Sequence, residues 1–319
     1  MKTKQVMPAI LAAAVAASCG GGSDRAPEGR SGAGPVDGDA PPLSVYVVNF
    51  PLASFAERIG GSKVSVTFPA PAEGDPAHWS PDADTVVAYQ GADLILLSGA
   101  DYAKWVGQAS LPAAKLVDTG VTYEDRLIPL EEEVTHTHGP GGEHAHAGVA
   151  FTTWLDPTLA VEQARAIAGA FEKARPTATT DFQEGLALLE ADLGALDTRL
   201  EAVAEAFGDR PVVFSHPVYQ YLERRYGLNG RSVHWEPDVE PSAREWGRFE
   251  ALLEEHPARW MVWEGEPLAP VRARLEELGV TSVVFDPCGN APESGDFVSA
   301  MGANVERLEA TWPGSRGES

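Results

Sequence analysis

Short apolar runs alternate with helix-like stretches along most of this chain. In the first half we predict strands at 43–48, 63–67, 93–97 and 115–117, with helices at 52–59, 83–90 and 101–108. In the second half the apolar runs lie at 211–214, 231–233, 260–263 and 282–285. Strands that alternate with helices are typical of α/β folds with parallel sheets.

A long helical pattern separates these two sets of strands. Apolar positions recur at helical spacing over 158–173 and again over 181–207. At 1.5 Å per residue the second helix would be about 40 Å long, enough to bridge two lobes. We therefore predict an α/β protein with two Rossmann-like lobes, each with a four-stranded parallel sheet, joined by a long rigid helix with a cleft between the lobes.

This pattern also predicts the domain boundaries. The N-terminal lobe is expected at 43–176, the linking helix at 177–208, the C-terminal lobe at 209–312 and a tail at 313–319. Residues 1–19 combine two lysines, an apolar stretch and Cys19, as in a lipoprotein signal whose cysteine carries the lipid. Ordinary signal cleavage, with Cys19 discarded or incidental, is the alternative. The glycine- and proline-rich stretch 20–42 is predicted to be a flexible tether.

The formal charge of the chain limits the kinds of partner that it is expected to bind. The formal charge of −23 would repel nucleic acid and anionic lipid and would attract cations. Cys288 is the one cysteine left after Cys19, so no disulfide is expected within the mature chain. A lone cysteine after a strand is more often a small buried hydrophobe than a metal ligand.

Polar residues able to bind metal follow each apolar run of the second half. They are His216 after the first run, His234 and Glu236 after the second, Glu264 after the third and Asp286 after the fourth. The carboxyl ends of parallel strands meet at one edge of a sheet, so these side chains should converge. Imidazole and carboxylate together suit zinc, manganese or iron, and the pattern predicts a metal site.

Several motifs resemble one known family. They are Asn49-Phe50-Pro51-Leu52 before Ile59-Gly60-Gly61, Trp154-Leu155-Asp156-Pro157, His216 with Tyr219 and Tyr221 leading to Tyr226-Gly227-Leu228, and Asp286-Pro287 with Gly289. In this order they resemble the zinc and manganese solute-binding lipoproteins of ABC transporters, cluster A-I, of which the chain would be a divergent member. The resemblance implies a metal held between two lobes of a monomer and delivered to a membrane permease driven by a cytoplasmic ATPase. It also implies lipid anchoring at the periplasmic or extracellular face of the membrane.

The resemblance implies ligands residue by residue. His216 and Asp286 match a ligand histidine and a ligand carboxylate of the family. His78, in Asp75-Pro76-Ala77-His78, is displaced by one place from the family histidine. Thr152 stands where the family usually has a histidine, so either His234, Glu236, water or a loop histidine completes the site, or the protein binds something other than the usual metal. Glu264 is interpreted as a residue that orients a ligand imidazole.

The stretch 131–148 is rich in histidine, glycine and acidic residues. Its histidines are His136, His138, His144 and His146. Lacking apolar periodicity, it should be a flexible surface loop. The stretch resembles the histidine-rich insertions of zinc-type members of the family. It would bind metal weakly, as an auxiliary site. A solvated polar loop with incidental affinity is the alternative.

The expected function is capture of a divalent metal, most of all Zn²⁺, with Mn²⁺ or Fe²⁺ as alternatives. No Gly-x-Ser-x-Gly elbow and no His-Glu-x-x-His helix occurs in the sequence, and we predict that the protein is not an enzyme. A metal-dependent hydrolase of the envelope and a lipid-anchored adhesin with a degenerate metal site are the competing hypotheses. Because imidazole must be neutral to bind a metal, affinity should fall below roughly pH 6.

Overall fold

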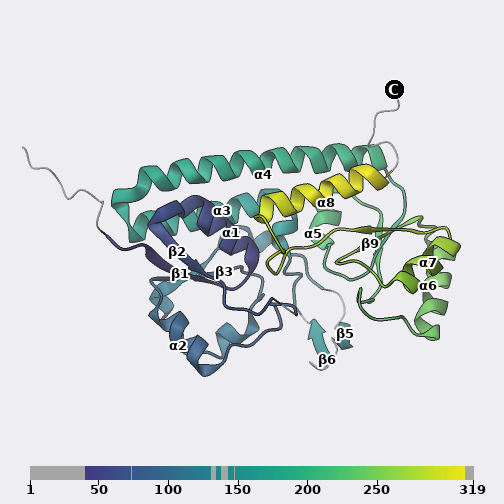
Figure 1. Ribbon diagram of the computed structural model, residues 1–319, viewed down its shortest axis with the longest axis horizontal. Helices are drawn as coiled ribbons and strands as arrows, with labels where there is room; N and C mark the ends of the chain where they lie inside the picture. The colour runs from purple at the N-terminus through teal and green to yellow at the C-terminus, as the bar shows by residue number, and fades with distance from the viewer. Residues whose placement is uncertain (1–39, 73, 131–133, 138–142, 147, 313–319) are drawn as a thin grey trace, which may run out of the picture. The chain divides into compact units, whose positions relative to one another are not determined.

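Two four-stranded parallel sheets form the framework of the protein (Figure 1). The computed structural model describes residues 40–72, 74–130, 134–137, 143–146 and 148–312. The predicted signal peptide, Cys19, most of the tether, His138 and the tail lie outside these described residues. From Ala40 onward the described chain belongs to one compact unit.

The first sheet has the strand order β2-β1-β3-β4, and every neighbouring pair is parallel. Its strands are β1 (Leu43–Val47), β2 (Val64–Thr67), β3 (Leu94–Leu97) and β4 (Leu116–Asp118). Helices α1 (Phe50–Gly60), α2 (Ala83–Gly91) and α3 (Pro157–Ala174) belong to this lobe. Helix α1 begins directly after β1 because the Asn49 side chain accepts a hydrogen bond from Leu52 N and Pro51 suits the first helical turn.

The second sheet repeats the same arrangement, with the order β10-β9-β7-β8 and parallel pairs throughout. Its strands are β7 (Val212–Phe214), β8 (Gly230–Ser232), β9 (Trp260–Trp263) and β10 (Thr281–Val284). Its helices are α5 (Gln220–Tyr226), α6 (Ala243–Glu255), α7 (Ala269–Glu277) and α8 (Phe297–Thr311). The predicted fold class, α/β with two four-stranded parallel sheets in two lobes, is confirmed.

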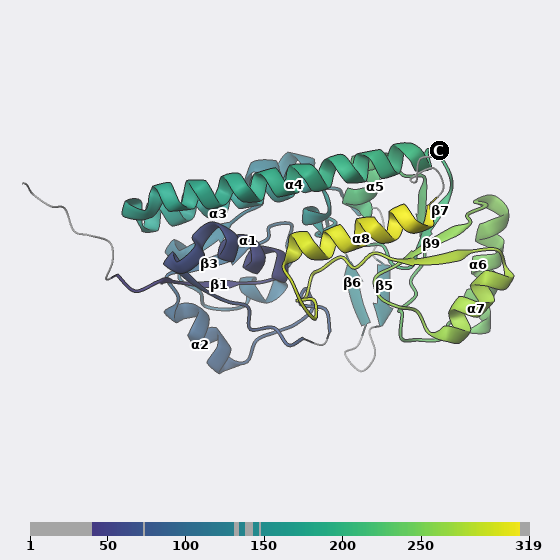
Figure 2. The same ribbon diagram turned by 45° about the horizontal axis from the view of Figure 1, so that its top comes forward.

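Helix α4 (Thr179–Phe207) is 29 residues long and runs past both lobes (Figure 2). It packs against α1 and α3 of the first lobe and against α5 and α8 of the second. Its large buried side chains fall three or four apart, as the sequence pattern requires: Phe182, Leu186, Leu189, Leu193, Leu196, Leu200, Val203 and Phe207. These side chains join one hydrophobic core that includes residues of both lobes, so α4 ties the lobes together.

A smaller core lies within the second lobe. Trp235, Trp246, Phe249 and Trp263 pack together there, with ring centroids of Trp235 and Trp246 4.7 Å apart. Trp235, Trp246 and Trp263 are therefore core residues of this lobe. Within the described residues no helix is both long enough and apolar enough to cross a membrane.

Two local predictions were wrong. The helix expected at 101–108 is only a 3-10 turn, Lys104–Gly107, because Ala100 and Asp101 adopt positive φ angles and the chain bends there. The histidine-rich stretch, predicted to be a flexible surface loop, contains two strands, β5 (Val134–Thr137) and β6 (Glu143–His146), which pair antiparallel. The pairing sets His136 opposite His144. Other 3-10 turns are Gly61–Lys63, Ala113–Lys115, Val121–Arg126, Thr153–Leu155 and Pro176–Ala178.

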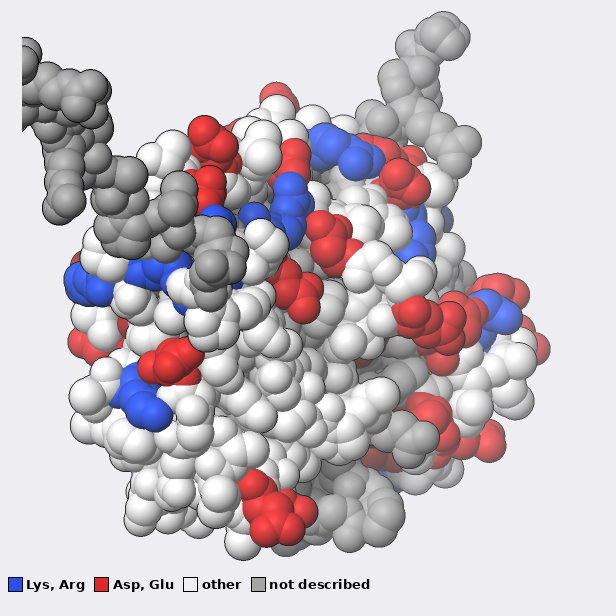
Figure 3. Space-filling view, turned by 60° about the vertical axis from the view of Figure 1, so that its left-hand side comes forward, with Lys and Arg blue, Asp and Glu red and all other residues white. Residues whose placement is uncertain are grey.

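The charge of the chain is not gathered in one patch on the face shown in Figure 3. Acidic and basic side chains are interspersed on this face, and a broad area carries neither. This face therefore shows no single strongly charged surface for a partner.

Candidate metal centre

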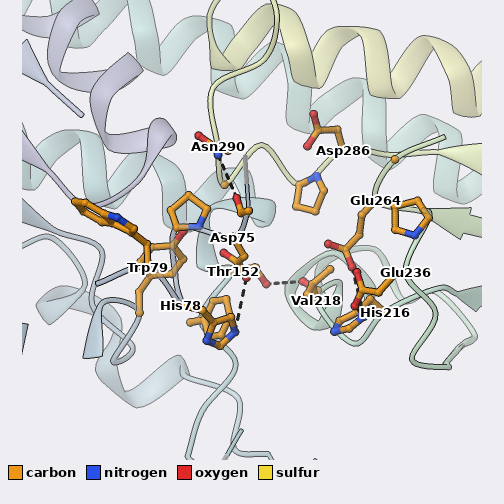
Figure 4. A pocket seen from close by; sticks show the side chains of 18 of the residues that line it. Asp75, His78, Trp79, Thr152, His216, Val218, Glu236, Glu264, Asp286 and Asn290 are labelled. Atoms are coloured by element: carbon orange, nitrogen blue, oxygen red, sulfur yellow. Dashed lines mark hydrogen bonds and ion pairs between the residues drawn. The ribbon is translucent and has the colours of Figure 1, made fainter. Parts of the chain in front are cut away.

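A cavity of about 670 Å³ lies between the two lobes, at the carboxyl ends of the strands (Figure 4). His216, Glu236, Glu264 and Asp286 reach it from the loops that follow β7, β8, β9 and β10. The opposite wall comes from the first lobe. Ligands of open α/β sheets bind at this edge because the loops after the strands meet there.

His216 is the centre of the donor group on the second lobe. Its side chain is 5% exposed, and its Nδ1 atom lies 3.5 Å from Oε1 of Glu236 and 3.7 Å from Oε1 of Glu264. Backbone hydrogen bonds from Ser215 N to Val262 O and from Trp235 N to Ser215 O hold the strand ends that carry these residues. The arrangement brings an imidazole and two carboxylates from three strand ends to one wall.

Burial raises the pKa values of two acidic groups of the cavity. Burial, followed by the charges of Glu236, Asp75 and Asp286, raises the pKa of Glu264 to about 8. Burial also raises the pKa of Asp286, although the hydrogen bond from Cys288 N to its Oδ1 opposes this. None of the described residues that line the cavity is a lysine or an arginine. A bound cation would therefore stabilise the carboxylates in their charged form.

The first lobe contributes a second donor pair. His78 lines the cavity, and its Nε2 atom lies 3.8 Å from Oδ2 of Asp75. The backbone N–H of Ala77 donates to Oδ1 of Asp75, which fixes this turn, and the His78 ring packs edge-on against Phe151. The one-residue displacement noted in the sequence therefore still leaves His78 at the cavity.

Asp286 follows β10, as predicted, but its carboxylate is engaged in its own loop. Its Oδ1 accepts from Cys288 N at 2.7 Å, and the side chain of Asn304 brackets its backbone through hydrogen bonds to Asp286 N and O. In Figure 4 its carboxylate lies apart from the group formed by His216, Glu236 and Glu264. Asp286 is thus part of the cavity wall, while Glu236 and Glu264 are the carboxylates beside His216.

His234 is close to His216 without lining the cavity. The two imidazole rings pack edge-on with centroids 5.5 Å apart, and the described lining includes His216 but not His234. Burial lowers the pKa of His234, partly opposed by the charge of Glu236. This position suits a residue that supports the His216 ring.

Thr152 uses its hydroxyl to join the lobes. The side chain is buried and donates from Oγ1 to the carbonyl oxygen of Val218 at 2.5 Å. Cys288 is also buried, and burial raises the pKa of its thiol, which disfavours a thiolate ligand. Neither residue is arranged as a metal donor.

The donors lie on two opposing walls, with Asp75 and His78 on one and the group around His216 on the other. Across the described part of the chain, no group of three or more His, Cys, Asp or Glu residues is arranged so that it could hold a metal ion. The sequence interpretation did not single out Asp75 as a carboxylate of the cavity, although its position before Pro76 and His78 was noted. It also missed Tyr102, whose buried ring lines the cavity. No sequence signal marks Tyr102, because it follows a bend that local propensity does not predict.

Known proteins resemble this chain over most of its length. Residues 45–311 match the sequence profile of the family described as zinc-uptake complex component A, periplasmic. A protein of Treponema pallidum to which metal binding is provisionally ascribed is 24% identical over 277 residues, which cover 83% of this chain and 86% of that protein.

Solved structures show the same fold. The metal-dependent lipoprotein YcdH of Bacillus subtilis is 21% identical with a TM-score of 0.72, over 85% of this chain and 99% of that one. Zinc-bound AdcA of Streptococcus pneumoniae is 20% identical with a TM-score of 0.71, over 85% of this chain and 58% of that one. The matching family consists of solute-binding proteins rather than enzymes, which confirms that prediction and removes the metallohydrolase alternative. The chain belongs to the ZnuA family, the periplasmic component A of zinc-uptake complexes.

Proposed function

We propose that this protein captures a divalent transition metal outside the cytoplasm, zinc first, and delivers it to the membrane permease of an ABC transporter driven by a cytoplasmic ATPase. The observation that carries the proposal is the cavity between the lobes, which is lined by two histidines and five carboxylates and by no lysine or arginine among the described residues. Such a lining favours a cation and offers the imidazole and carboxylate donors that zinc accepts. The zinc bound by AdcA supports the same metal here.

We propose His216 as the principal ligand, with Glu236 as its nearest carboxylate. His78 would bind from the opposite lobe, with Asp75 beside its ring, and Glu264 would orient His216 or join the ligand set. Asp286 is retained as a ligand that would first release the Cys288 N–H. His234 supports the His216 ring. Mn²⁺ and Fe²⁺ are the alternative metals because they accept the same donors.

The capture involves binding without a chemical reaction. Imidazole and carboxylate groups replace the water shell of the ion, and the lobes shield it from solvent. We propose that Cys19 anchors the monomeric protein by a lipid to the periplasmic or extracellular face of the membrane. The histidines His136, His138, His144 and His146 would form an auxiliary site; in the backbone pairing of β5 with β6, His136 stands opposite His144.

Two neighbouring imidazoles provide a matched test. His216→Ala should weaken zinc binding at least a hundredfold in a chelator competition, because it removes the buried ligand. His234→Ala, which removes a ring beside it, should weaken binding less than tenfold. Elemental analysis of the purified protein should still find one zinc per chain after deletion of residues 136–146. An unchanged affinity in His216→Ala, or loss of all zinc with the deletion, would contradict the proposal.

A further inference from the structure

The cavity between the lobes is far larger than a metal ion needs. Its volume is about 670 Å³. A six-coordinate ion with a full shell of water would fill roughly 180 Å³, taking ~30 Å³ for each water. Sites for small organic molecules have volumes of about 300–1,000 Å³. The cavity therefore has the size of a small-molecule site.

Hydrogen bonds between the lobes oppose a closure that would remove this surplus volume. Hydrogen bonds join the lobes from Trp154 Nε1 to Pro287 O at 2.7 Å and from Phe50 N to Gly289 O at 3.1 Å. Others run from Tyr221 OH to Ala150 O at 2.9 Å and from Asn290 Nδ2 to Pro71 O at 2.9 Å. Collapse around a bare ion would have to break or strain several of these hydrogen bonds.

The wall formed by the first lobe is suited to an organic molecule. Trp79, Tyr102, Phe151 and Trp154 all line the cavity, and the Tyr102 ring packs edge-on against Phe151 and Trp154. The Tyr102 side chain is buried, and among the described residues its hydroxyl has no hydrogen-bond partner. A buried hydroxyl without a partner costs free energy, so packing of the ring against Phe151 and Trp154 has to hold Tyr102 in the wall.

The wall formed by the second lobe sets the charge of the ligand. Glu236, Asp238, Glu264 and Asp286 line it, and Asp75 faces them from the first lobe. A metal complexed by an anionic chelator would meet carboxylates without any lysine or arginine among the described lining residues. Repulsion therefore selects against anionic complexes and for cationic ones.

We infer that the cavity takes the metal together with a small nitrogen-donor chelator, as a complex of net positive charge. His216 and the carboxylates of the second lobe bind the exposed side of the metal. The chelator lies against the aromatic wall and supplies the donors that the chain itself does not bring together, since Thr152 uses its hydroxyl to join the lobes. This inference rests on the proposed metal capture and adds the chemical class of the cargo.

Zinc alone, zinc with L-histidine and zinc with citrate are the probes that test it. The one-to-one zinc–histidine complex is cationic and the citrate complex is anionic. Native mass spectrometry of the full chain should show protein, zinc and histidine in a single complex, and competition titration should show binding at least tenfold tighter than for zinc alone. Citrate should not be retained.

Two other results would contradict the chelator inference alone, and a third would also contradict the proposed metal capture. Zinc bound equally well with and without histidine, or retention of citrate as readily as histidine, overturns the chelator inference and leaves the proposed metal capture intact. Failure to bind zinc in any form overturns both.

Two valine substitutions test whether the zinc–histidine complex binds in this cavity. Val239 is 52% exposed and lines the cavity, so Val239→Trp should occupy part of it. It should weaken binding of the zinc–histidine complex at least tenfold more than it weakens binding of zinc alone. Val87→Trp is the control, because Val87 is 63% exposed on α2 and does not line the cavity. Equal affinities of the two variants for the zinc–histidine complex would overturn its placement in this cavity.

Discussion

The Thr152 hydroxyl bonds one lobe to the other, at the position where the family usually has a ligand histidine. Thr152→Val keeps the shape of the side chain but removes the hydroxyl, so the carbonyl oxygen of Val218 loses this hydrogen bond. We expect the free energy of unfolding to fall by about 1–2 kcal/mol, measured by denaturant titration. Zinc affinity should stay within threefold of wild type. A tenfold loss of zinc affinity with unchanged stability would instead make the hydroxyl a ligand.

Glu223 on α5 gives stability a pH dependence that is separate from metal binding. Burial raises its pKa from 4.5 to about 7. The folded state therefore holds this proton more tightly than the unfolded state, so the contribution is complete below about pH 4.5 and is lost as the pH rises through 7.

Glu223→Gln should remove this loss. The variant should match wild type near pH 4.5 and exceed it by about 1–3 kcal/mol above pH 8, in denaturant unfolding measured across that range. Parallel stability curves at all pH values would show that this carboxyl does not titrate as described.

At the scale of elements, the sequence predicts what depends on local pattern and misses what depends on tertiary contact. The strands and the long helix follow from apolar periodicity, and the placing of His216 and Glu264 at strand ends follows from the topology of parallel sheets. Which ring faces the cavity does not follow, because His216 and His234 stand after adjacent strands and differ only in packing. The helix expected at 101–108 failed because propensity does not register the positive φ angles of Ala100 and Asp101.

Helix α4 offers a test of how closely it packs against α1. A methyl group on Gly185 would lie 2.6 Å from the carbonyl oxygen of Ile59 and 2.8 Å from that of Arg58, so the two helices would have to separate. Gly185→Ala should lower the free energy of unfolding by about 1–3 kcal/mol. Gly194→Ala in the same helix meets no atom within 4 Å and should raise it by about 0.5–1 kcal/mol, through helix propensity alone. Thermal and denaturant unfolding would measure both; equal effects would contradict the close packing.

At the scale of the whole molecule, the two lobes act as one body with a preformed cavity. Helix α4 contributes to a core that both lobes share, and hydrogen bonds cross the cavity edge from several elements. Wide hinge opening would expose this core, so we expect cargo to be released by local loosening at the mouth rather than by separation of the lobes. The mouth is therefore where the dissociation rate should be set.

Asn290 is the residue through which this rate can be tested. Its Nδ2 atom donates to the carbonyls of Pro71, Ala72 and Gly74, and so holds the loop that carries Asp75 and His78 against the second lobe. Asn290→Ala removes no donor to the metal but frees that loop. Zinc should dissociate about three to ten times faster in a stopped-flow chelator assay, because the hydrogen bonds of Asn290 to this loop are lost and a net loss of about 1 kcal/mol changes a rate about fivefold. Asn229→Ala, which removes a comparable exposed bond to Asp209 away from the cavity, should leave the rate unchanged. Equal rates in the two variants would mean that the loop does not gate the cavity, and that opening occurs elsewhere between the lobes.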